Sequence, residues 1–479
     1  MLVSFAAFRA RNRPLSSLRC LASAKWHRYQ SPALRRYTKA AHAAPPITQV
    51  EKLLLDSIRA TGPLSFATYM QACLSHPTQG YYMNPEHPVF GSRGDFITSP
   101  EISQVFGELV GIWLLSQWQS AGMPPAIRLI ELGPGRGTLM EDILRVISQV
   151  SSKIDPSLLK EIHLVETSEA MREIQKQKLG SFVDKAGCDL HWHDNVDRIP
   201  PSPAFSMVVA HEFFDALPFY LLQKTKPDEW REVMIASALD PIKDPRLHPV
   251  PEIASIPRPP SERQPEPIYP RLRRVISPEP TPASIGISRL SPRFKDLPAG
   301  SFLEVSPVLF YKARILATLL GSSLSKTTAD QPSDIKPTTN GGGCGLIIDY
   351  GDAKAFGDSF RAFKDHKIVD VFDRPGHCDL TTNVDFSLLR EAMGDLVTSH
   401  GPITQGDFLT RMGISVRVDA LARRAETEER RAAIREAADR LVDPVGMGKE
   451  YRFMGFTSFR AEGSSMQKTP VYPFEMDVD

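Results

Sequence analysis

The sequence predicts an α/β fold built on a mostly parallel β-sheet, and three observations support this prediction. Between residues 127 and 211, short apolar runs alternate with longer segments of helical spacing, a pattern typical of βαβ units. The first apolar run, IRLIEL, leads directly into a glycine-rich turn and then into a helical segment. A later apolar run, GLIIDYG at residues 345–351, predicts that the sheet resumes after two polar stretches.

The first 50 residues differ in charge from the rest of the chain. They carry nine Lys or Arg and no Asp or Glu, with apolar residues interspersed. A basic amphipathic segment of this kind is typical of a mitochondrial transit peptide, and Arg35-Arg36-Tyr37 resembles a processing signal, so we predict cleavage near Thr38. The alternative is a basic arm that binds nucleic acid. The acidic excess of the remaining chain disfavours it, and we expect a mitochondrial protein without a nucleic-acid partner.

Composition narrows the class of protein further. Hydrophobic residues make up 42% and charged residues 24% of the 479 residues, values that are ordinary for a globular protein. No apolar stretch is long enough to predict a membrane span. The five cysteines are scattered without a CxxC pair, which predicts free thiols and neither a disulfide framework nor a zinc site.

The positions of proline and glycine along the chain predict the domain organisation. The segment 1–45 is the predicted transit peptide, and 46–125 holds two helices broken at Gly62-Pro63, then a site-covering loop and a helix with Ser99 as its predicted N-cap. The core of the α/β domain is predicted at 126–240. Fifteen prolines in residues 241–298 predict an exposed insert. The rest of the sheet and accessory helices, one of them near 420–441, are expected at 299–465, with a loose tail at 466–479.

The glycine-rich turn predicts a cofactor loop. Gly133, Gly135 and Gly137 stand at alternate positions after the first strand, where the absent side chains let the backbone turn sharply and approach a ligand. A dinucleotide fingerprint would need glycine at position 138, but Thr138 is there. The spacing therefore favours S-adenosylmethionine (AdoMet) over NAD, in a Rossmann-like domain, although a bare tight turn is the open alternative.

Acidic residues follow the predicted strands. The carboxyl ends of parallel strands meet at one edge of a sheet, so we expect Glu131, Glu166 and Asp194 to lie around the cofactor. Glu166, after the second strand, is predicted to accept both ribose hydroxyls. Asp194 is expected near the adenine ring, and Glu131 near the methionine part.

The acceptor site is predicted at VVAHEFFDALPFY. His211, Glu212 and Asp215 come at the end of the fourth strand. A guanidinium has a pKa above about 12 and therefore keeps its charge at neutral pH. Carboxylates that bind two of its nitrogen atoms can hold it in place as a methyl acceptor. Glu212 and Asp215 are the candidates, and no metal is required. The open alternatives are that Asp215 caps a following helix and that His211 is a satisfied core residue.

A loop before the core is a candidate lid. Gly94 and Asp95, with Tyr81, Tyr82 and Arg93 nearby, are predicted to close over the cofactor and to place another carboxylate at the reaction centre. A polar turn without a catalytic role remains the alternative.

Several motifs in a fixed order resemble the MidA-like family of mitochondrial protein arginine methyltransferases, which assist assembly of respiratory complex I. The resemblance runs from about Val50 to Phe456 and departs mainly at residues 241–270 and 322–343. Its motifs are GYYMNP, GDFITSPEISQVFGELVG, LIELGPGRGTLMEDILR, AHEFFDALP, WREVMI, GLIIDYGD and DLTTNVDF.

The resemblance implies a class I methyltransferase fold with an additional α+β portion, symmetric dimethylation of an arginine on a complex I core subunit, and residence in the mitochondrial matrix. It marks Gly133, Gly135 and Gly137 as the cofactor loop and Glu166 as the ribose ligand. The resemblance also draws attention to Gly94, Asp95, Glu212, Phe213, Phe214, Asp215 and Pro218.

Two rival functions are a non-catalytic assembly chaperone that retains the fold and a nicotinamide-dependent oxidoreductase.

Overall fold

The computed structural model describes residues 46–83, 97–239, 247–249, 271–321, 341–459 and 471–475. The predicted transit peptide at 1–45 lies outside the described residues, as do Gly94, Asp95 and Arg93 of the candidate lid. Most of the two polar stretches, at 250–270 and 322–340, also lies outside them.

The largest sheet of the described chain has eight strands. Seven of them form a continuous hydrogen-bonded order, and the short β15 (Val384–Asp385) pairs with one of these. The order is β16 (Val397–Thr404), β17 (Tyr451–Ser458), β11 (Gly343–Asp352), β5 (Phe205–His211), β2 (Ile127–Leu132), β3 (Leu159–Val165) and β4 (Asp189–His193).

The strand directions fix where a ligand can bind. Strands β4, β3, β2, β5 and β11 are parallel, whereas β17 runs antiparallel to both β11 and β16. From β2 the chain builds outward through β3 and β4 and then crosses back to β5 on the other side. Such a reversal beside β2 opens a crevice at the carboxyl edge of the sheet. The predicted α/β class with a mostly parallel sheet is confirmed.

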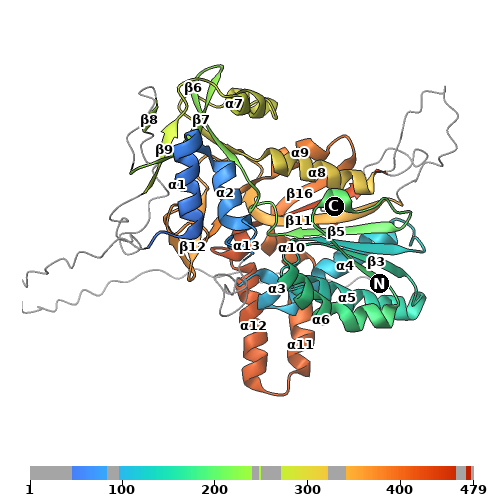
Figure 1. Cartoon of the computed structure of the whole chain (residues 1–479). Coiled ribbons are helices and arrows are strands. Elements are labelled where there is room, and N and C mark those ends of the chain that lie inside the picture. The colour runs from blue at the N-terminus through green and yellow to red at the C-terminus, as the bar shows by residue number, and fades with distance from the viewer. Residues whose placement is uncertain are drawn as a thin grey trace, which may run out of the picture. The chain divides into compact units, whose positions relative to one another are not determined.

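Burial explains why β2 and β5 occupy the centre. Every residue of both strands is buried, because each strand has a neighbour on either side and helices on both faces. Helices α4 (Gln104–Ser120), α5 (Thr138–Ile154) and α6 (Glu169–Ala186) cover one face, and α8 (Pro307–Leu320) and α9 (Phe386–Met393) cover the other (Figure 1). The core therefore consists of two apolar layers separated by the sheet.

Two helices replace the one expected after the candidate lid. The short α3 (Ser99–Ile102) follows Thr98, and α4 begins one residue beyond Ser103, whose hydroxyl accepts the amide hydrogen of Val105. The predicted N-cap at Ser99 is therefore wrong. Ser103 adopts an extended conformation (φ −155°) that interrupts the helix, so it caps α4 instead.

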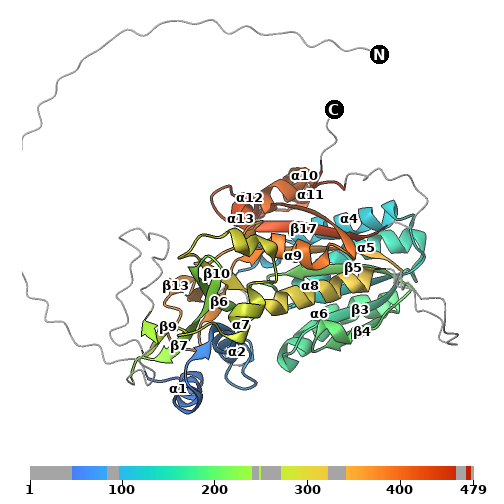
Figure 2. The same ribbon diagram turned by 90° about the horizontal axis from the view of Figure 1, so that it is seen from above.

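A second, antiparallel sheet has the order β10-β6-β7-β9-β8, with β1 beside β7. It packs against α1 (Gln49–Thr61) and α2 (Phe66–Ser75), the two helices predicted before the core (Figure 2). Two of its strands fall in the predicted core segment 126–240, so that segment contributes to both sheets. The strands are β1 (Leu64–Ser65), β6 (Tyr220–Lys226), β7 (Glu229–Ser237), β8 (His248–Pro249), β9 (Leu272–Ile276) and β10 (Phe302–Val305).

The exposed insert expected at 241–298 does not extend over its second part. Strand β9 pairs with β7, and Leu272 and Val275 are buried. Helix α7 (Pro282–Ile287) follows, with Pro282 in its first turn, where the missing amide hydrogen is harmless. The 3₁₀ helices η1 (Val196–Arg198) and η2 (Pro292–Asp296) are short connectors. Proline density here reflects helix starts and turns within a folded segment.

The remaining elements lie mostly near the C-terminus. The charged helix predicted near 420–441 is two helices, α11 (Ile414–Arg424) and α12 (Glu428–Val442), which pair with each other and project from the sheet (Figure 1). No described helix has the length and apolar character needed to cross a membrane. The other elements are β12 (Arg361–Lys364), β13 (Lys367–Val369), β14 (Asp379–Thr381), α10 (Gln405–Arg411) and α13 (Met447–Glu450).

Part of the predicted loose tail is packed. The indole of Trp113 donates to the carbonyl of Tyr472 at 3.0 Å, and Phe474 is only 8% exposed. Residues 471–475 therefore cover α4. The four described cysteines, Cys73, Cys188, Cys344 and Cys378, are buried free thiols, as the sequence predicts.

Candidate active site

The glycine-rich turn joins β2 to α5 and needs all three of its glycines. Gly133, Gly135 and Gly137 have φ values of 63°, 50° and 76°, which lie in the left-handed region that glycine adopts without strain. A Cβ added to Gly133 would lie 3.1 Å from the ring of Phe213. Arg136 in the same turn lies 3.8 Å from Glu101 of α3. The turn therefore sits directly between the helix before it and the loop after β5.

Glu166 is tied to the same turn by a residue that sequence reasoning missed. The buried amide of Gln175, on α6, donates to the carbonyl of Gly135 at 2.7 Å and to the Glu166 carboxylate at 3.3 Å. The backbone amide of Ser168 also donates to Glu166 at 2.8 Å. Gln175 is held in turn by the indole of Trp192. The end of β3 and the glycine turn are thereby fixed relative to each other.

Glu131 is a buried carboxyl group with spare bonding capacity. It is 2% exposed, and its Oε2 atom has no hydrogen-bond partner among the described residues. Burial raises its pKa to about 8. A buried polar atom of this kind is costly unless something else pairs with it, and its place one residue before the end of β2 suits a cationic ligand at the glycine turn.

Asp194 does not join the buried groups. Its side chain is 81% exposed and forms an ion pair of 2.5 Å with Arg172, which also donates to the carbonyl of Glu166. The structure thus ties Asp194 to the end of β3 through Arg172. Its predicted place beside the adenine ring remains a prediction.

Asp349, a second residue that sequence reasoning missed, holds the loop after β5 by accepting hydrogen bonds from its backbone. Asp349 is fully buried on β11, and one of its carboxylate oxygens accepts the amide hydrogens of Phe213, Phe214 and Asp215 at 3.2, 2.9 and 3.3 Å. Burial, and next the charge of Asp215, raise its pKa. The available signal was a carboxylate inside the otherwise apolar run GLIIDYG.

Glu212 stands at the start of this loop in a constrained conformation. Its φ of 49° is unusual for a residue other than glycine, and its side chain is 17% exposed. The hydroxyl of Tyr451 on β17 donates to its carboxylate, and that hydroxyl lies 2.6 Å from the hydroxyl of Tyr350 on β11. The side chain of Glu212 is therefore held from a different strand than its backbone.

Several acids surround Glu212. Burial, and then the nearby charges of Asp215, Asp379 and Glu101, raise its pKa to about 8 against the lowering effect of the Tyr451 hydrogen bond. Burial raises the pKa of Asp215 to about 6, against the opposing charge of Arg361. The hydroxyl of Tyr82 donates to Asp379 at 2.7 Å. Several carboxyl groups therefore lie close together here with few positively charged neighbours. A bound cation would stabilise their ionised forms.

Both open alternatives at this loop are settled by the geometry. No helix follows Asp215 before β6, so it is not a helix cap. His211 is 7% exposed and stacks on Tyr451, but its Nε2 atom has no hydrogen-bond partner and lies 3.8 Å from Glu212. Burial lowers its pKa to about 3. His211 is therefore a neutral ring beside Glu212 and not a satisfied core residue.

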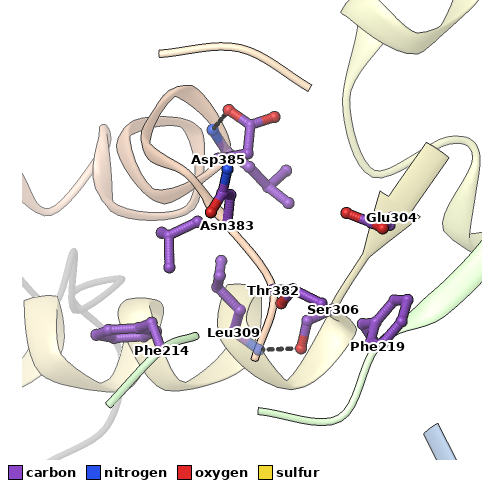
Figure 3. Close-up of a pocket in the computed structure, with 10 residues that line it drawn as sticks. Phe214, Phe219, Glu304, Ser306, Leu309, Thr382, Asn383 and Asp385 are labelled. Carbon is purple, nitrogen blue, oxygen red and sulfur yellow. Dashed lines mark hydrogen bonds between the residues drawn. The ribbon is translucent and has the colours of Figure 1, made fainter. Parts of the chain in front are cut away.

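A small cavity borders the loop after β5, and Figure 3 shows the side chains that line it. It is lined in part by Phe214 and Thr382 and encloses about 20 Å³, room for a single water. The two carboxylates in its lining already accept hydrogen bonds. Glu304 accepts the amide hydrogens of Ser359 and Phe360, and Asp385 accepts those of the first turn of α9. This cavity is a packing feature and not the site of chemistry.

The fold and the turn together define the class of protein. A crystal structure of a Burkholderia thailandensis protein described as a methyl transferase, with S-adenosyl-homocysteine bound, matches 87% of this chain and 95% of that chain at a TM-score of 0.61 and 20% identity. A second crystal structure from that organism gives a TM-score of 0.60 at 21% identity. The fold is that of the class I AdoMet-dependent methyltransferases, as the sequence predicts.

The family follows from sequence comparison. The model of an S-adenosyl-L-methionine-dependent methyltransferase family matches residues 109–403, and the chain belongs to this family. Its cofactor is AdoMet, and the buried, unpaired oxygen of Glu131 beside the glycine turn fits a cationic ligand. Within the described ranges, no group of three or more His, Cys, Asp or Glu side chains is arranged to hold a metal ion.

Named relatives cover nearly the whole chain. The mitochondrial protein arginine methyltransferase NDUFAF7 of Danio rerio is 36% identical over 455 residues, 91% of this chain and 94% of its own. The Homo sapiens protein of the same name is 36% identical over 444 residues, and the Drosophila melanogaster homolog is 36% identical over 423. The family resemblance seen in the sequence is confirmed.

Proposed function

We propose that this protein transfers a methyl group from AdoMet to an arginine side chain of a protein in the mitochondrion. The observation that carries the proposal is the group of carboxyl groups around Glu212 at the carboxyl edge of the sheet, beside the glycine turn. Buried acids in excess of cations favour a cationic acceptor, and the named relatives support arginine as that acceptor.

The cofactor has a defined set of candidate ligands. The backbone of Gly133–Gly137 and the carboxylates of Glu166 and Glu131 would hold it. When bound, AdoMet supplies an electrophilic methyl group and leaves as the neutral thioether S-adenosyl-homocysteine. Asp194 at the adenine and Gly94 in the lid remain part of the proposal.

The chain's own residues orient the acceptor. Glu212 and Asp215 bind the guanidinium fork and hold one nitrogen toward the cofactor. The neighbouring rings of Phe213 and Phe214 exclude water from the carboxylates, which strengthens the ion pairs. The nitrogen gives up one proton as its new bond to carbon forms, and a carboxylate with a pKa near 8 can accept it. His211 packs beside Glu212 as a neutral neighbour, and Asp95 is proposed to add a carboxylate from the lid.

The finer assignment rests on the family resemblance. We infer symmetric dimethylation of an arginine, the type II reaction, on a core subunit of respiratory complex I during its assembly in the matrix. The basic segment at residues 1–50 and the word mitochondrial in the relatives' names support the compartment.

One experiment separates the enzyme from the chaperone alternative. The purified protein is incubated with AdoMet carrying a labelled methyl group and with recombinant complex I core subunits, and arginines are mapped by mass spectrometry. The proposal expects label on arginine, with fragment ions of symmetric dimethylarginine, and none with Glu212→Gln. AdoMet binding by calorimetry without any labelled arginine would contradict the proposal and favour a chaperone that retains the fold.

A further inference from the structure

Two tyrosines on neighbouring strands form a buried hydroxyl pair beside Glu212. Tyr350 on β11 and Tyr451 on β17 are directly opposite each other in the antiparallel register. Their ring centroids are 4.0 Å apart, and Tyr451 is only 1% exposed. The Tyr451 hydroxyl lies between the Glu212 carboxylate and the Tyr350 hydroxyl, which is 2.6 Å away.

The number of hydroxyl hydrogens determines which group donates in each of these hydrogen bonds. Each phenol has one hydrogen to donate. When Glu212 is ionised, Tyr451 donates its one hydrogen to the carboxylate, and the Tyr350 hydroxyl remains beside it at 2.6 Å. The guanidinium of Arg361 lies 5.3 Å over the ring of Tyr350, so a positive charge lies beside the hydroxyl pair. The arrangement therefore stabilises the ionised form of Glu212.

The backbone of Glu212 gives independent support. A left-handed conformation at a residue with a side chain is strained and persists only where its surroundings impose it. Here the amide of Glu212 donates to the carbonyl of Ile348 at 3.0 Å, and Asp349 accepts the three following amides. The backbone is thus fixed from β11, while Tyr451 on β17 fixes the carboxylate.

We propose that Tyr451 is a positioning residue that keeps the Glu212 carboxylate ionised and in one orientation for the acceptor guanidinium. The proposal deepens the function above and rests on it. Tyr451 acts through Glu212 and is not itself a catalytic residue.

The other charged groups around Glu212 explain why such support is needed. Asp215 and Asp379 both favour the neutral form of Glu212, as does Glu101 on α3. His211 is neutral because burial lowers its pKa to about 3, and the guanidinium of Arg361 lies over the Tyr350 ring and acts on Asp215. The hydrogen bond from the Tyr451 hydroxyl acts in the opposite direction and lowers the pKa of Glu212.

The test removes single hydroxyls and keeps the rings. The carboxyl band of Glu212 is assigned in infrared difference spectra by comparison with Glu212→Gln, and its titration midpoint is then measured. We expect Tyr451→Phe to raise the midpoint by about one pH unit, because a hydrogen bond to a charged group is lost. Tyr350→Phe, which keeps the Tyr451 hydroxyl, should change it less.

Tyr69→Phe is the matched control. Tyr69 is also a buried tyrosine, 1% exposed, and its hydroxyl donates to the carbonyl of Val371 at 2.5 Å, away from Glu212. Its removal should leave the midpoint unchanged. An unchanged midpoint in Tyr451→Phe, in a folded protein that binds AdoMet, would overturn the inference.

The pH dependence of kcat/KM distinguishes the proposed role of Tyr451 from a packing defect. The rising limb of kcat/KM against pH should move upward by the same amount in Tyr451→Phe, so the rate falls about tenfold at pH 7 and recovers at higher pH. A uniform loss at all pH values would overturn the inference while leaving the proposed function intact. A wild-type protein that methylates no arginine would defeat the proposed function, and the infrared titration would still test Tyr451.

Discussion

The two halves of the site are built in different ways. The cofactor half, at the ends of β2 and β3, is joined by short-range contacts, with Gln175 bridging the glycine turn and Glu166 within about one βαβ unit. The acceptor half joins residues that are 134 to 239 positions apart, through Asp349 and Tyr451. The cofactor half can therefore form from one stretch of chain, whereas the acceptor half exists only after β11 and β17 have joined the sheet.

The halves also differ in how strongly their carboxyl groups act on one another. Glu166 accepts hydrogen bonds from Ser168 and Gln175. Glu212 and Asp215 instead lie in a cluster of acids whose pKa values are raised by burial. The comparison teaches that the acceptor half stores unfavourable electrostatics that a cationic substrate relieves, so changes there should affect catalysis more than folding.

Glu212→Gln tests the acceptor half with the largest expected effect. The isosteric amide keeps the volume but removes the charge, and we expect turnover to fall about 1000-fold with AdoMet affinity preserved. Single-turnover kinetics and calorimetry measure the two quantities. Glu304→Gln is the control, because Glu304 is also a buried carboxyl group but accepts hydrogen bonds from the amide and hydroxyl of Ser359 and the amide of Phe360. Near-normal turnover in Glu212→Gln would remove that residue from the mechanism.

Gly135→Val tests the cofactor half. Gly135 has a φ of 50°, which a β-branched residue does not adopt without strain, so we expect AdoMet affinity to fall about 100-fold or more. Gly187→Val is the matched control, because Gly187 has a φ of 61° at the end of α6 and open space around an added Cβ. It should lower the melting temperature and leave the affinity unchanged. Equal affinity in folded Gly135→Val would mean that the turn is not the cofactor loop.

Asp349→Asn tests whether support of the loop matters for catalysis. The change weakens the acceptor for three backbone amides, so we expect a loss of about 1–3 kcal/mol in the free energy of unfolding and about tenfold lower turnover through misplacement of Glu212. Asp385→Asn is the control, since Asp385 also accepts backbone amides, at the start of α9. It should lose stability alone. If both variants lose turnover equally, the special role of Asp349 is wrong.

The smallest expected effect is the release of a proton when the cofactor binds. This release tests directly whether Glu131 contacts the cofactor. Because burial raises the pKa of Glu131 to about 8, this carboxyl is mostly protonated at pH 7, and a cationic ligand should drive release of up to about one proton. Affinity should therefore rise as pH increases toward 8. Calorimetry in buffers of different ionisation enthalpy measures the release.

The matched variant for that measurement is Glu131→Gln, which should release fewer protons than the wild type. Without cofactor, the buried neutral form stabilises the fold at low pH, and this stability is lost as pH rises from the ordinary value of 4.5 through about 8. Equal proton release by wild type and variant would show that Glu131 does not meet the cofactor.

The sequence by itself determined the cofactor half. Strand β2, the three glycines, helix α5 and the acid after β3 were all predicted at their observed places, because they depend on local spacing and on backbone freedom that a short segment encodes. The break between α3 and α4 was missed, since helical spacing alone does not show that Ser103 adopts an extended conformation.

Only the tertiary structure decided what holds the acceptor half together. Glu212 and Asp215 were visible in the sequence, but Asp349 and Tyr451 reach them across 134 to 239 positions of chain. Nothing in a local pattern specifies which strand lies beside which. The raised pKa values of the acids have the same origin, because burial and neighbouring charges arise only when the sheet and its helices close around them.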